Sequence, residues 1–530
     1  IVEGGAEFKE TKAMSQRDME FSVLKTVIRG EILAAFKTNE VVLGNYENIQ
    51  CFHPDTEVMT DNGFVSVTDI KVGDKIASMN PETGLIEFKD TAKIYTYDYD
   101  GEMYTQKKSL VNGQNIALKT DYMITPEHKM FGKEKNCKHS TFKSDYKFKR
   151  ISEIQENTFG SPKNGEWDGK IIEEFIIEKT EDSEKLSRNG RKTTTFPIVP
   201  WLKFLGWFIS EGCYRRASSY ELGIAQANEE GLTKLREDLK DFPYTFKEYQ
   251  SKDWHGSTFV TSGKDLYNYL IENVGHYCHE KRIPRDILNL HPSLLEYLFY
   301  SLIEGDGTKT KNDSFVFYTT SKGLANDVYE LALRVGRVPT LKGGNEGLVR
   351  KSEKYPNKKN MWQVYISNKE QNNKLVTIRP EKVEYKGKVY CFEVPPYHNV
   401  LTRYNGKSLM ISQSYEGIAN AHQSFWKETL LPKMIYVEDF LWAKFFSNLF
   451  GGKYWGSFDI SVIEALREDY KSKVEMAEIL NKMGYPINMI NKRLDMGFED
   501  VKWGNTWFVK MGTVPVEYAM ENPVPEPAKP

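Results

Sequence analysis

Apolar residues recur with different spacings along the chain. In residues 19–28, and at several places after residue 414, they return every three or four positions, which predicts amphipathic helices. Residues 51–131, and again 376–413, consist of short alternating runs broken by Asn-Gly, Asn-Pro and Asp-Asn-Gly turns, which predicts β-strands. We expect these two β-rich stretches to form one compact body, with residues 132–375 looped out between them as a second domain.

Residues 51–413 interrupt a helical pattern. When Gln50 is joined directly to Ser414, the spacing of one amphipathic helix continues from Ile49 into the residues beyond, at Ile418, Ala419, His422, Phe425 and Trp426. Each half alone has a shorter apolar face, and a long segment in the middle of a helix leaves that face unable to pack continuously. The pattern therefore predicts that residues 51–413 are an inserted unit that is removed.

The chain of 530 residues is longer than a domain built around one hydrophobic core, so several domains are expected. The net charge of −2 neither favours nor excludes nucleic acid as a partner. No apolar run approaches the roughly 20 residues that cross a bilayer, and the first residues do not resemble a signal peptide. We therefore expect a cytoplasmic protein with no membrane partner and, because the chain starts at Ile1 and not at Met, a fragment.

All five cysteines lie between Cys51 and Gln413. Their odd number and the absence of a Cys-x-x-Cys pair favour reduced thiols, one of which could be a nucleophile. Cys51 stands at the first position of the insert, next to the carbonyl that such a nucleophile would attack.

Three stretches at the ends of the insert match the pattern of a known family. CFHPDTEVMT at its start, MITPEHKMF over Met123–Phe131 and VYCFEVPPYHNV near its end resemble the splicing blocks of inteins. The resemblance implies an all-β, horseshoe-like splicing domain of the Hint type, built from residues 51–131 and 376–413. It also implies autocatalytic excision without a cofactor, which joins the two flanking host segments.

Breaking the bond before the insert needs an acyl acceptor. The Cys51 thiolate can attack the Gln50 carbonyl and form a thioester, because thiolates are strong nucleophiles. Forming a thioester from an amide is uphill, so the site must strain the bond or protonate the leaving nitrogen; in inteins this role falls to a Thr-x-x-His pair, here Thr125 and His128. The alternative for this stretch is a helix N-cap followed by a surface histidine.

The resemblance assigns the later steps to the other end of the insert. Ser414 would take the acyl group from the thioester as an ester, and Gln413 would then cyclise through its side-chain amide and release the insert. His398 is placed like the histidine that assists this cleavage, and Cys391 stands where many inteins have Asp, with a buried structural cysteine as the alternative. Because the insert ends in Ser-Gln, where inteins usually have His-Asn, slower cleavage is expected.

Two apolar stretches in the middle of the insert share a second pattern. FLGWFISEG over Phe204–Gly212 and FYSLIEGDG over Phe299–Gly307 each carry small residues four apart and an acid, Glu211 or Asp306. Small residues let two helices approach closely, which would bring the two carboxylates together. The stretches resemble the LAGLIDADG motifs of homing endonucleases, which implies an α/β domain of two pseudo-symmetric halves within residues 132–375.

By this resemblance, Glu211 and Asp306 would hold Mg²⁺ against a phosphodiester of double-stranded DNA. The expected target is the host gene that lacks the insert. Basic residues expected near the phosphates are Lys143, Lys147, Lys149, Arg150, Arg215, Arg216, Lys281 and Arg282. For the run KEKNCKHSTFKSDYKFKR a solvated charged face is the alternative.

The flanks, residues 1–50 and 414–530, resemble mainly helical parts of tailed-phage portal proteins. This implies a homo-oligomeric ring around viral DNA in the virion, preceded by a precursor in the cytoplasm of the phage's host; a helical fragment of another structural protein is the alternative. Two other functions stay open for the insert: one that has lost splicing or nuclease activity, and a hedgehog-like autoprocessing domain, which the nucleophile at Ser414 disfavours.

Overall fold

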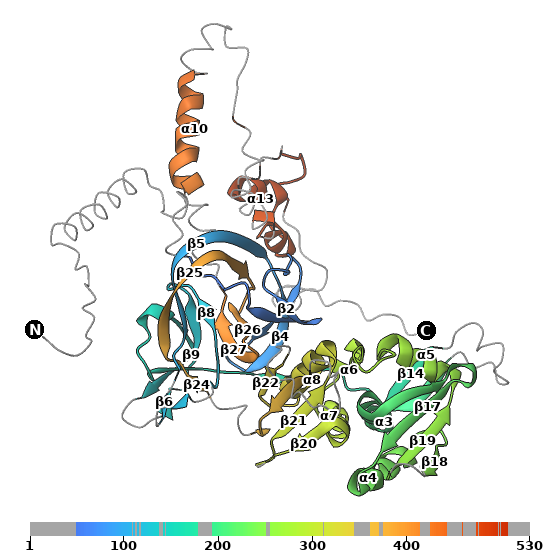
Figure 1. The fold of residues 1–530 in the computed structure, drawn as a ribbon. Coiled ribbons are helices and arrows are strands. Elements are labelled where there is room, and N and C mark those ends of the chain that lie inside the picture. The colour runs from blue at the N-terminus through green and yellow to red at the C-terminus, as the bar shows by residue number, and fades with distance from the viewer. Residues whose placement is uncertain are drawn as a thin grey trace, which may run out of the picture. The chain divides into compact units, whose positions relative to one another are not determined.

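A computed structural model gives the fold (Figure 1). It describes residues 49–108, 118–136, 141–178 apart from 144, 193–250, 255–343 apart from 311, 361–369, 375–413 and 425–441, with residues 110–111, 114–115, 458 and most of 473–506. The chain divides into two units, one spanning Tyr46–Tyr415 and the other made of Ile1–Asn45 and Glu416–Pro530.

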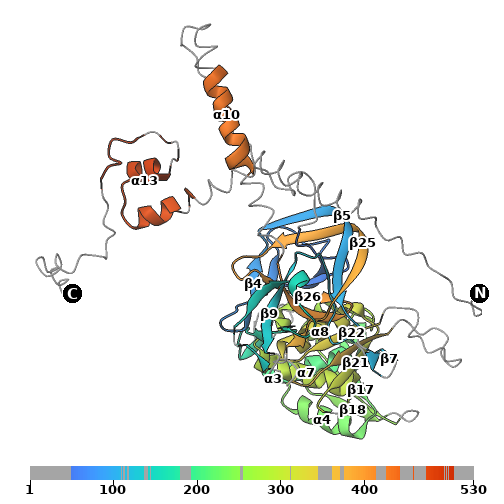
Figure 2. The same cartoon turned by 90° about the vertical axis from the view of Figure 1, so that its left-hand side faces the viewer.

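A long antiparallel ribbon joins the two β-rich stretches of the larger unit. β5 (Lys93–Gln106) pairs with β25 (Pro380–Glu393) along its full length, and Figure 2 shows the two strands side by side. β8 (Met123–Ile124) pairs with the end of β5. The two stretches with alternating patterns thus pair with each other, as predicted.

The hairpin of β26 (Asn399–Tyr404) and β27 (Lys407–Ser412) leads to the last residue of the insert. Asn405 and Gly406 close it with positive φ angles of 46° and 71°, the backbone that two-residue hairpin turns require. Alternate side chains serve two hydrophobic cores, one holding Val400, Leu409 and Ile411 and the other Leu401 and Met410. Because both faces are buried, the hairpin has a single register.

Strand pairing continues beyond the predicted boundary at residue 131. β9 (Lys129–Asn136) lies between β11 (Lys147–Arg150) and β12 (Phe159–Ser161), and β12 pairs with β24 (Val376–Thr377). Phe131 stacks on Tyr146 with ring centroids 4.8 Å apart. The aromatic residues of the lysine-rich run therefore anchor it to the β body, and the looped-out domain begins later than the sequence predicts.

Two consecutive helix–strand patterns follow. The first contains α3 (Ile198–Glu211), β16 (Gly212–Arg216), β17 (Glu221–Gln226), α4 (Glu229–Lys240), β18 (Lys247–Gln250) and β19 (Ser257–Ser262). The second contains α7 (Pro292–Asp306), β20 (Gly307–Lys309), β21 (Phe315–Thr319), α8 (Lys322–Arg334), β22 (Pro339–Lys342) and β23 (Trp362–Ile366). The strand orders, β16-β17-β19-β18 and β20-β21-β23-β22, correspond position by position, so the halves are pseudo-symmetric.

One sheet runs from the β body into the second half. Its order is β13-β4-β3-β1-β26-β27-β22-β23-β21-β20, and the junction is the pairing of Thr340 with Lys407. The strands not yet bounded are β1 (Glu57–Thr60), β3 (Lys75–Met79), β4 (Leu85–Asp90) and β13 (Glu166–Trp167). The second half is therefore fused to the β body through backbone hydrogen bonds.

Shorter elements complete the larger unit. They are β2 (Gly63–Ser66), β6 (Leu110–Val111), β7 (Gln114–Asn115), β10 (Thr141–Phe142), β14 (Glu174–Glu178), β15 (Thr193–Pro197), α5 (Lys264–Asn273) and α6 (Arg285–Leu288). β14 pairs with β15 immediately before α3 and so orients the start of that helix.

In the smaller unit, the described helices include a π-helical turn over Phe425–Leu430, α10 (Leu431–Glu438) and α13 (Ile487–Leu494). Of the predicted joined helix, only Ile49, Gln50, Phe425 and Trp426 lie within the described residues, so its continuity stays a prediction. Ser414 also lies outside them. Among the helices that the structure describes, none is long and apolar enough to cross a membrane.

Candidate functional sites

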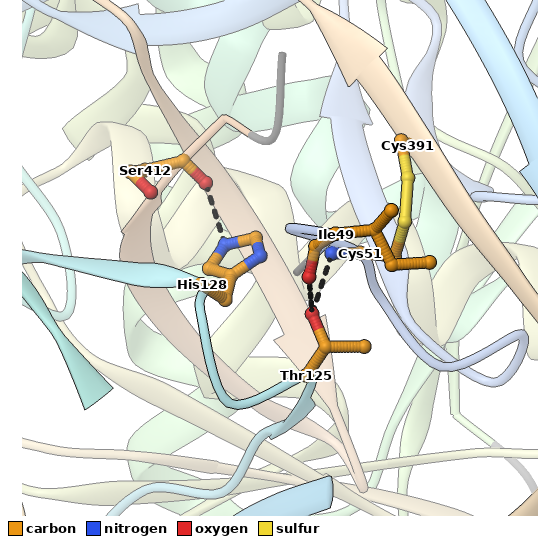
Figure 3. The surroundings of a disulfide bond; sticks show 6 residues. All are labelled: Ile49, Cys51, Thr125, His128, Cys391 and Ser412. Atoms are coloured by element: carbon orange, nitrogen blue, oxygen red, sulfur yellow. Dashed lines mark hydrogen bonds between the residues drawn. A yellow bond between two sulfur atoms is a disulfide. The ribbon is translucent and has the colours of Figure 1, made fainter. Parts of the chain in front are cut away.

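Thr125 holds the backbone on both sides of the Gln50–Cys51 bond (Figure 3). Its hydroxyl donates to the Ile49 carbonyl oxygen at 2.5 Å and accepts from the Cys51 amide nitrogen at 2.9 Å. Its own amide nitrogen donates to the Cys51 carbonyl oxygen at 3.1 Å. Ile49, Cys51 and Thr125 are all fully buried. The bond that begins the insert is therefore held between buried residues, although Gln50 itself is partly exposed.

His128 lies between the two ends of the insert. Its Nε2 donates to the Ser412 carbonyl oxygen at 2.9 Å, while Nδ1 has no partner among the described residues and points toward the Ile49–Cys51 segment in Figure 3. Complete burial lowers the pKa of His128 to about 3, so the ring is neutral, with its proton on Nε2 and a lone pair on Nδ1. The alternative of a surface histidine after a helix N-cap is wrong, because Thr125 opens a turn and His128 is buried.

The side chain of Gln413 is held at both of its polar atoms. Its Oε1 accepts from the amide nitrogen of Val394, and its Nε2 donates to Nδ1 of His398. The Gln413 amide nitrogen also donates to the His398 carbonyl oxygen at 2.9 Å. His398 and Gln413 are thus brought together, as the sequence predicts, with an imidazole lone pair facing the amide nitrogen that would cyclise.

Asn399 is a site residue that the sequence analysis missed. It is fully buried, its Oδ1 accepts from the Met79 amide nitrogen, and its Nδ2 donates to the Met79 carbonyl oxygen, both at 2.7 Å. Nδ2 also donates to the Tyr397 carbonyl oxygen at 3.2 Å. These bonds fix the residues around His398, whose φ of 54° is uncommon for a residue other than glycine. The only sequence signal was a polar residue beside that histidine.

Replacing Asn399 with Ala should destabilise the protein by about 1–3 kcal/mol for each backbone group of Met79 left unpaired. The matched control is Asn62→Ala, because the Asn62 side chain is exposed and its hydrogen bond is to the neighbouring Asp61. Urea unfolding compares the two variants. Equal unfolding midpoints would show that the buried bonds of Asn399 do not hold this loop.

Cys51 and Cys391 form a disulfide, with Cα atoms 4.7 Å apart. The expectation of reduced thiols is therefore wrong for this pair. The cause is strand register: Phe52 and Tyr390 exchange backbone hydrogen bonds of 2.8 and 3.0 Å, which places the preceding and following residues opposite each other. Cys391 is buried, as its structural alternative requires, but it is bonded to the predicted nucleophile.

The second site lies where α3 and α7 meet. A Cβ added at Gly206 would lie 2.7 Å from the Ser301 Cβ, and one added at Gly305 would lie 2.5 Å from the Ser210 Cβ. Only glycine permits such contacts, since real Cβ atoms do not approach so closely. The prediction that small residues four apart let the two helices touch is confirmed.

Glu211 and Asp306 are the last residues of these two helices. Burial, together with the nearby Asp306 carboxylate, raises the pKa of Glu211 to about 7. Burial also raises the pKa of Asp306 to about 6, against the opposing charge of Lys281. The described residues contain no group of three or more side chains that could hold a metal, so these two acids would share a cation with other oxygens, such as those of a phosphate or water.

Lys281 does not face outward as a DNA-binding residue should, whereas Arg282 is exposed but already paired. Lys281 is buried, and its Nζ donates to the Gly212 carbonyl oxygen at 2.9 Å and to the Phe208 and Ser210 carbonyl oxygens at the end of α3. Arg282 donates to both carboxylate oxygens of Asp327, at 2.6 and 2.8 Å. The prediction of a phosphate contact is therefore wrong for Lys281, which completes the end of a helix, and stays a prediction for Arg282.

The other predicted basic residues differ in their surroundings. Lys143 and Lys149 contact Glu134, and Arg150 contacts Glu127 and Glu153. Lys147 is exposed, as are Arg215 and Arg216 on the strand that follows Glu211. DNA contact by these residues stays a prediction, and the exposed arginines beside the carboxylates are placed best for it.

Residues 295–377 match the family described as a LAGLIDADG-like domain. This part of the chain is LAGLIDADG-like. The matched range begins within α7 and includes Asp306, α8 and the four strands of the second half.

Curated relatives with diverse names share part of their length with this chain. It is 27% identical over 310 residues to the ATP-dependent Clp protease proteolytic subunit of Chlamydomonas moewusii, covering 55% of this chain and 28% of the relative. It is 23% identical over 369 residues to the ribonucleoside-diphosphate reductase subunit beta of Aquifex aeolicus, covering 67% of this chain and 48% of the relative. It is 25% identical over 322 residues to the ATP-dependent DNA helicase Hel308 of Thermococcus kodakarensis, covering 54% of this chain and 27% of the relative. The chain thus spans less than half of each.

Two kinds of solved structure are similar to part of the chain. The structure of I-DmoI in complex with DNA and Mn is 14% identical in sequence, with a TM-score of 0.23. The match covers 33% of this chain and 92% of the I-DmoI chain. The bacterial intein-like domain from Clostridium thermocellum is 20% identical in sequence, with a TM-score of 0.16. The match covers 22% of this chain and 66% of that domain's chain.

Acidification should weaken the binding of a divalent cation that Glu211 and Asp306 would hold. Because the pKa values of Glu211 and Asp306 are raised to about 7 and 6, protons compete with the cation as the pH falls through this range. Without metal, the two partly buried charges destabilise the fold at higher pH, and protonation relieves this cost. Mg²⁺ should therefore raise the melting temperature at about pH 8 and much less at about pH 6.

Thermal melts of the full chain with and without Mg²⁺ measure this effect. Asp306→Asn should abolish the shift at both pH values, whereas Glu304→Gln, one residue before Gly305 and paired with Lys234, should retain it. An equal shift in the Asp306 variant would exclude this residue as a ligand.

Proposed function

We propose that residues 51–413 are a self-splicing intein of the Hint fold that joins Gln50 to Ser414 and carries a LAGLIDADG-type homing endonuclease. One observation supports splicing most strongly: a single buried turn contacts both ends of the insert. Thr125 bonds to the backbone on both sides of Gln50, and His128 bonds to the carbonyl of Ser412. A structural turn alone has no need to hold both boundaries of a sequence insert.

In the first step, the free thiol of Cys51 attacks the Gln50 carbonyl carbon, and the amide bond between them breaks. The neutral His128 accepts the thiol proton at Nδ1 and passes it to the leaving nitrogen, which the Thr125 hydroxyl already contacts. Because every group is held in place, the reaction is intramolecular, and positioning alone lowers the barrier by several kcal/mol, up to about 11.

The later steps take place around Gln413. The Ser414 hydroxyl attacks the thioester, forms an ester and releases the Cys51 thiol. The Gln413 Nε2 then attacks its own main-chain carbonyl, with His398 Nδ1 placed to accept its proton and the Val394 amide holding Oε1. Ring closure yields a six-membered imide, and the ester shifts to the freed Ser414 nitrogen. Ser412 donates to the Lys129 carbonyl oxygen and supplies no imidazole, consistent with slow cleavage.

The relatives support an origin by insertion. Proteins named for a protease subunit, a reductase subunit and a helicase share 310 to 369 aligned residues with this chain but less than half of their own length. A segment that moves between unrelated host genes would produce this pattern, whereas a conserved host function would not.

The endonuclease proposal rests on the paired carboxylates and the LAGLIDADG-like match. Glu211 and Asp306 would hold a divalent cation, Mg²⁺ being the expected one, which when bound supplies charge stabilisation and an activated water for phosphodiester hydrolysis. The raised pKa values of the two acids fit such a site, because a cation would offset the cost of holding two partly buried carboxylates close together. Arg215 and Arg216, exposed beside them, would contact phosphates of the double-stranded target, the host gene without the insert.

For the flanks we propose a phage portal subunit that forms a ring around viral DNA once spliced. The precursor would reside in the cytoplasm of the host cell and the mature ring in the virion. Apolar side chains on the described flank helices support burial against other subunits, since Ile435, Tyr436 and Phe440 are all at least 47% exposed.

Cys51→Ala should abolish excision, and Thr125→Val should slow cleavage before residue 51 by about 100-fold, since it removes one preorganised hydrogen-bonding group. Thr141→Val is the matched control, because Thr141 is exposed in β10. Gel densitometry of the precursor in reducing buffer follows the reaction. Full-speed excision in the Cys51 variant would refute the thioester mechanism.

Asp306→Asn should reduce DNA cleavage by about 100-fold or more while splicing continues, because the carboxylates lie apart from the Thr125 turn. The substrate is a plasmid that carries the joined coding sequence for Asn48-Ile49-Gln50-Ser414-Tyr415, incubated with Mg²⁺. The amount of linear plasmid is compared between wild type, Asp306→Asn and the control variant Glu304→Gln. Equal cutting by the Asp306 variant would remove its catalytic role.

A further inference from the structure

We propose that the Cys51–Cys391 disulfide is a site of reversible thiol–disulfide exchange that keeps the insert from splicing until a thiol reductant opens it. The proposal rests on the proposed splicing function. It concerns when the reaction starts, which neither the resemblance to inteins nor the LAGLIDADG-like match addresses.

The disulfide blocks the reaction at its first atom. The Sγ of Cys51 is bonded to the Sγ of Cys391, so it has neither a proton to lose nor a free thiolate with which to attack Gln50. The surrounding groups are nevertheless already in place, since Thr125 contacts Cys51 and Ile49, and His128 contacts Ser412. The oxidised chain is therefore an assembled site that lacks only its nucleophile.

The register of the strands makes the pairing specific and reversible. The bridge between Phe52 and Tyr390 holds residues 51 and 391 opposite each other through backbone bonds that do not depend on the sulfur atoms. Reduction therefore leaves the two thiols facing each other and able to reoxidise. Cys213 and Cys278, the other two cysteines in the described part of the chain, are exposed and not bonded to any partner.

The exchange balances with an external dithiol. One thiolate of the dithiol attacks a sulfur of the protein disulfide, forming a mixed disulfide and releasing one cysteine thiolate. The second thiol then closes on the first, so the dithiol is oxidised to a cyclic disulfide and the protein gains two electrons and two protons. Cys51 is now a thiol, and its attack on Gln50 can begin.

Burial determines how a reductant reaches the bond. Cys51 is 0% exposed and Cys391 1% exposed, so exchange requires a local opening of the strands around them. We therefore expect a small dithiol to act, and the rate of splicing to stop rising with dithiol concentration once this opening limits it.

The test starts with the full chain purified after expression with an added thiol oxidant, such as diamide. Intact mass spectrometry before and after alkylation without reductant verifies that the disulfide is present. Dithiothreitol is then added to half of the sample. Wild type should yield joined flanks and free insert only in the reduced half, whereas Cys391→Ala, which cannot form the disulfide, should give the same rate in both halves.

Cys213→Ser is the matched control and should behave like wild type, since Cys213 is exposed and has no part in the bond. Splicing of oxidised wild type at the rate of the reduced sample would overturn the proposed switch. Failure of fully reduced wild type and of Cys391→Ala to splice at all would instead overturn the splicing function on which it rests.

Discussion

The antiparallel pairing of β5 with β25 is the constraint on which both ends of the insert depend. It joins strands from opposite ends of the insert and aligns them from Lys93↔Glu393 to Gln106↔Pro380. The residues between Gln106 and Pro380 leave and re-enter the ribbon at adjacent positions, and the entropic cost of such a loop grows slowly with its length. A large second domain can therefore be accommodated there without changing the register that sets Phe52 against Tyr390.

The second domain is nevertheless not an independent appendage. The β26–β27 hairpin lies between two hydrophobic cores, and β27 pairs with β22 of the LAGLIDADG-like half. Arg403, buried in β26, bonds to Glu57 at 2.6 and 2.8 Å and to Asn326 on α8 at 3.0 Å. Removing Glu57 would leave the buried charge of Arg403 poorly compensated, which is costly. The strand that leads to Gln413 is thus braced by both parts of the insert.

Features with local causes were predictable from the sequence. The small residues at Gly206 and Gly305 determine how closely two helices can pack, and the Asn-Gly pair at 405–406 determines a hairpin turn. Thr125 and His128 were identified because their spacing and neighbours match the resemblance to inteins. In the structure, Thr125 contacts Cys51 at the start of the insert and His128 contacts Ser412 near its end.

Features caused by distant pairing were not predictable. The disulfide joins residues 340 positions apart, and only the register of Phe52 with Tyr390 brings them together. Lys281 and Arg282 looked like free cations because their partners, the end of α3 and Asp327, lie more than 40 positions away. Asn399 matters because its buried side chain bonds to the Met79 backbone, and one asparagine in a predicted strand does not reveal whether its side chain is buried.

The central claim is that one buried site joins the two flanks by removing residues 51–413. Tandem mass spectrometry of the reduced, incubated chain tests it most directly, by sequencing peptides that contain Gln50. Splicing predicts a peptide that reads Asn48-Ile49-Gln50-Ser414-Tyr415. If Gln50 is found followed only by Cys51, and Gln413 only by Ser414, splicing does not occur and the proposed function is contradicted.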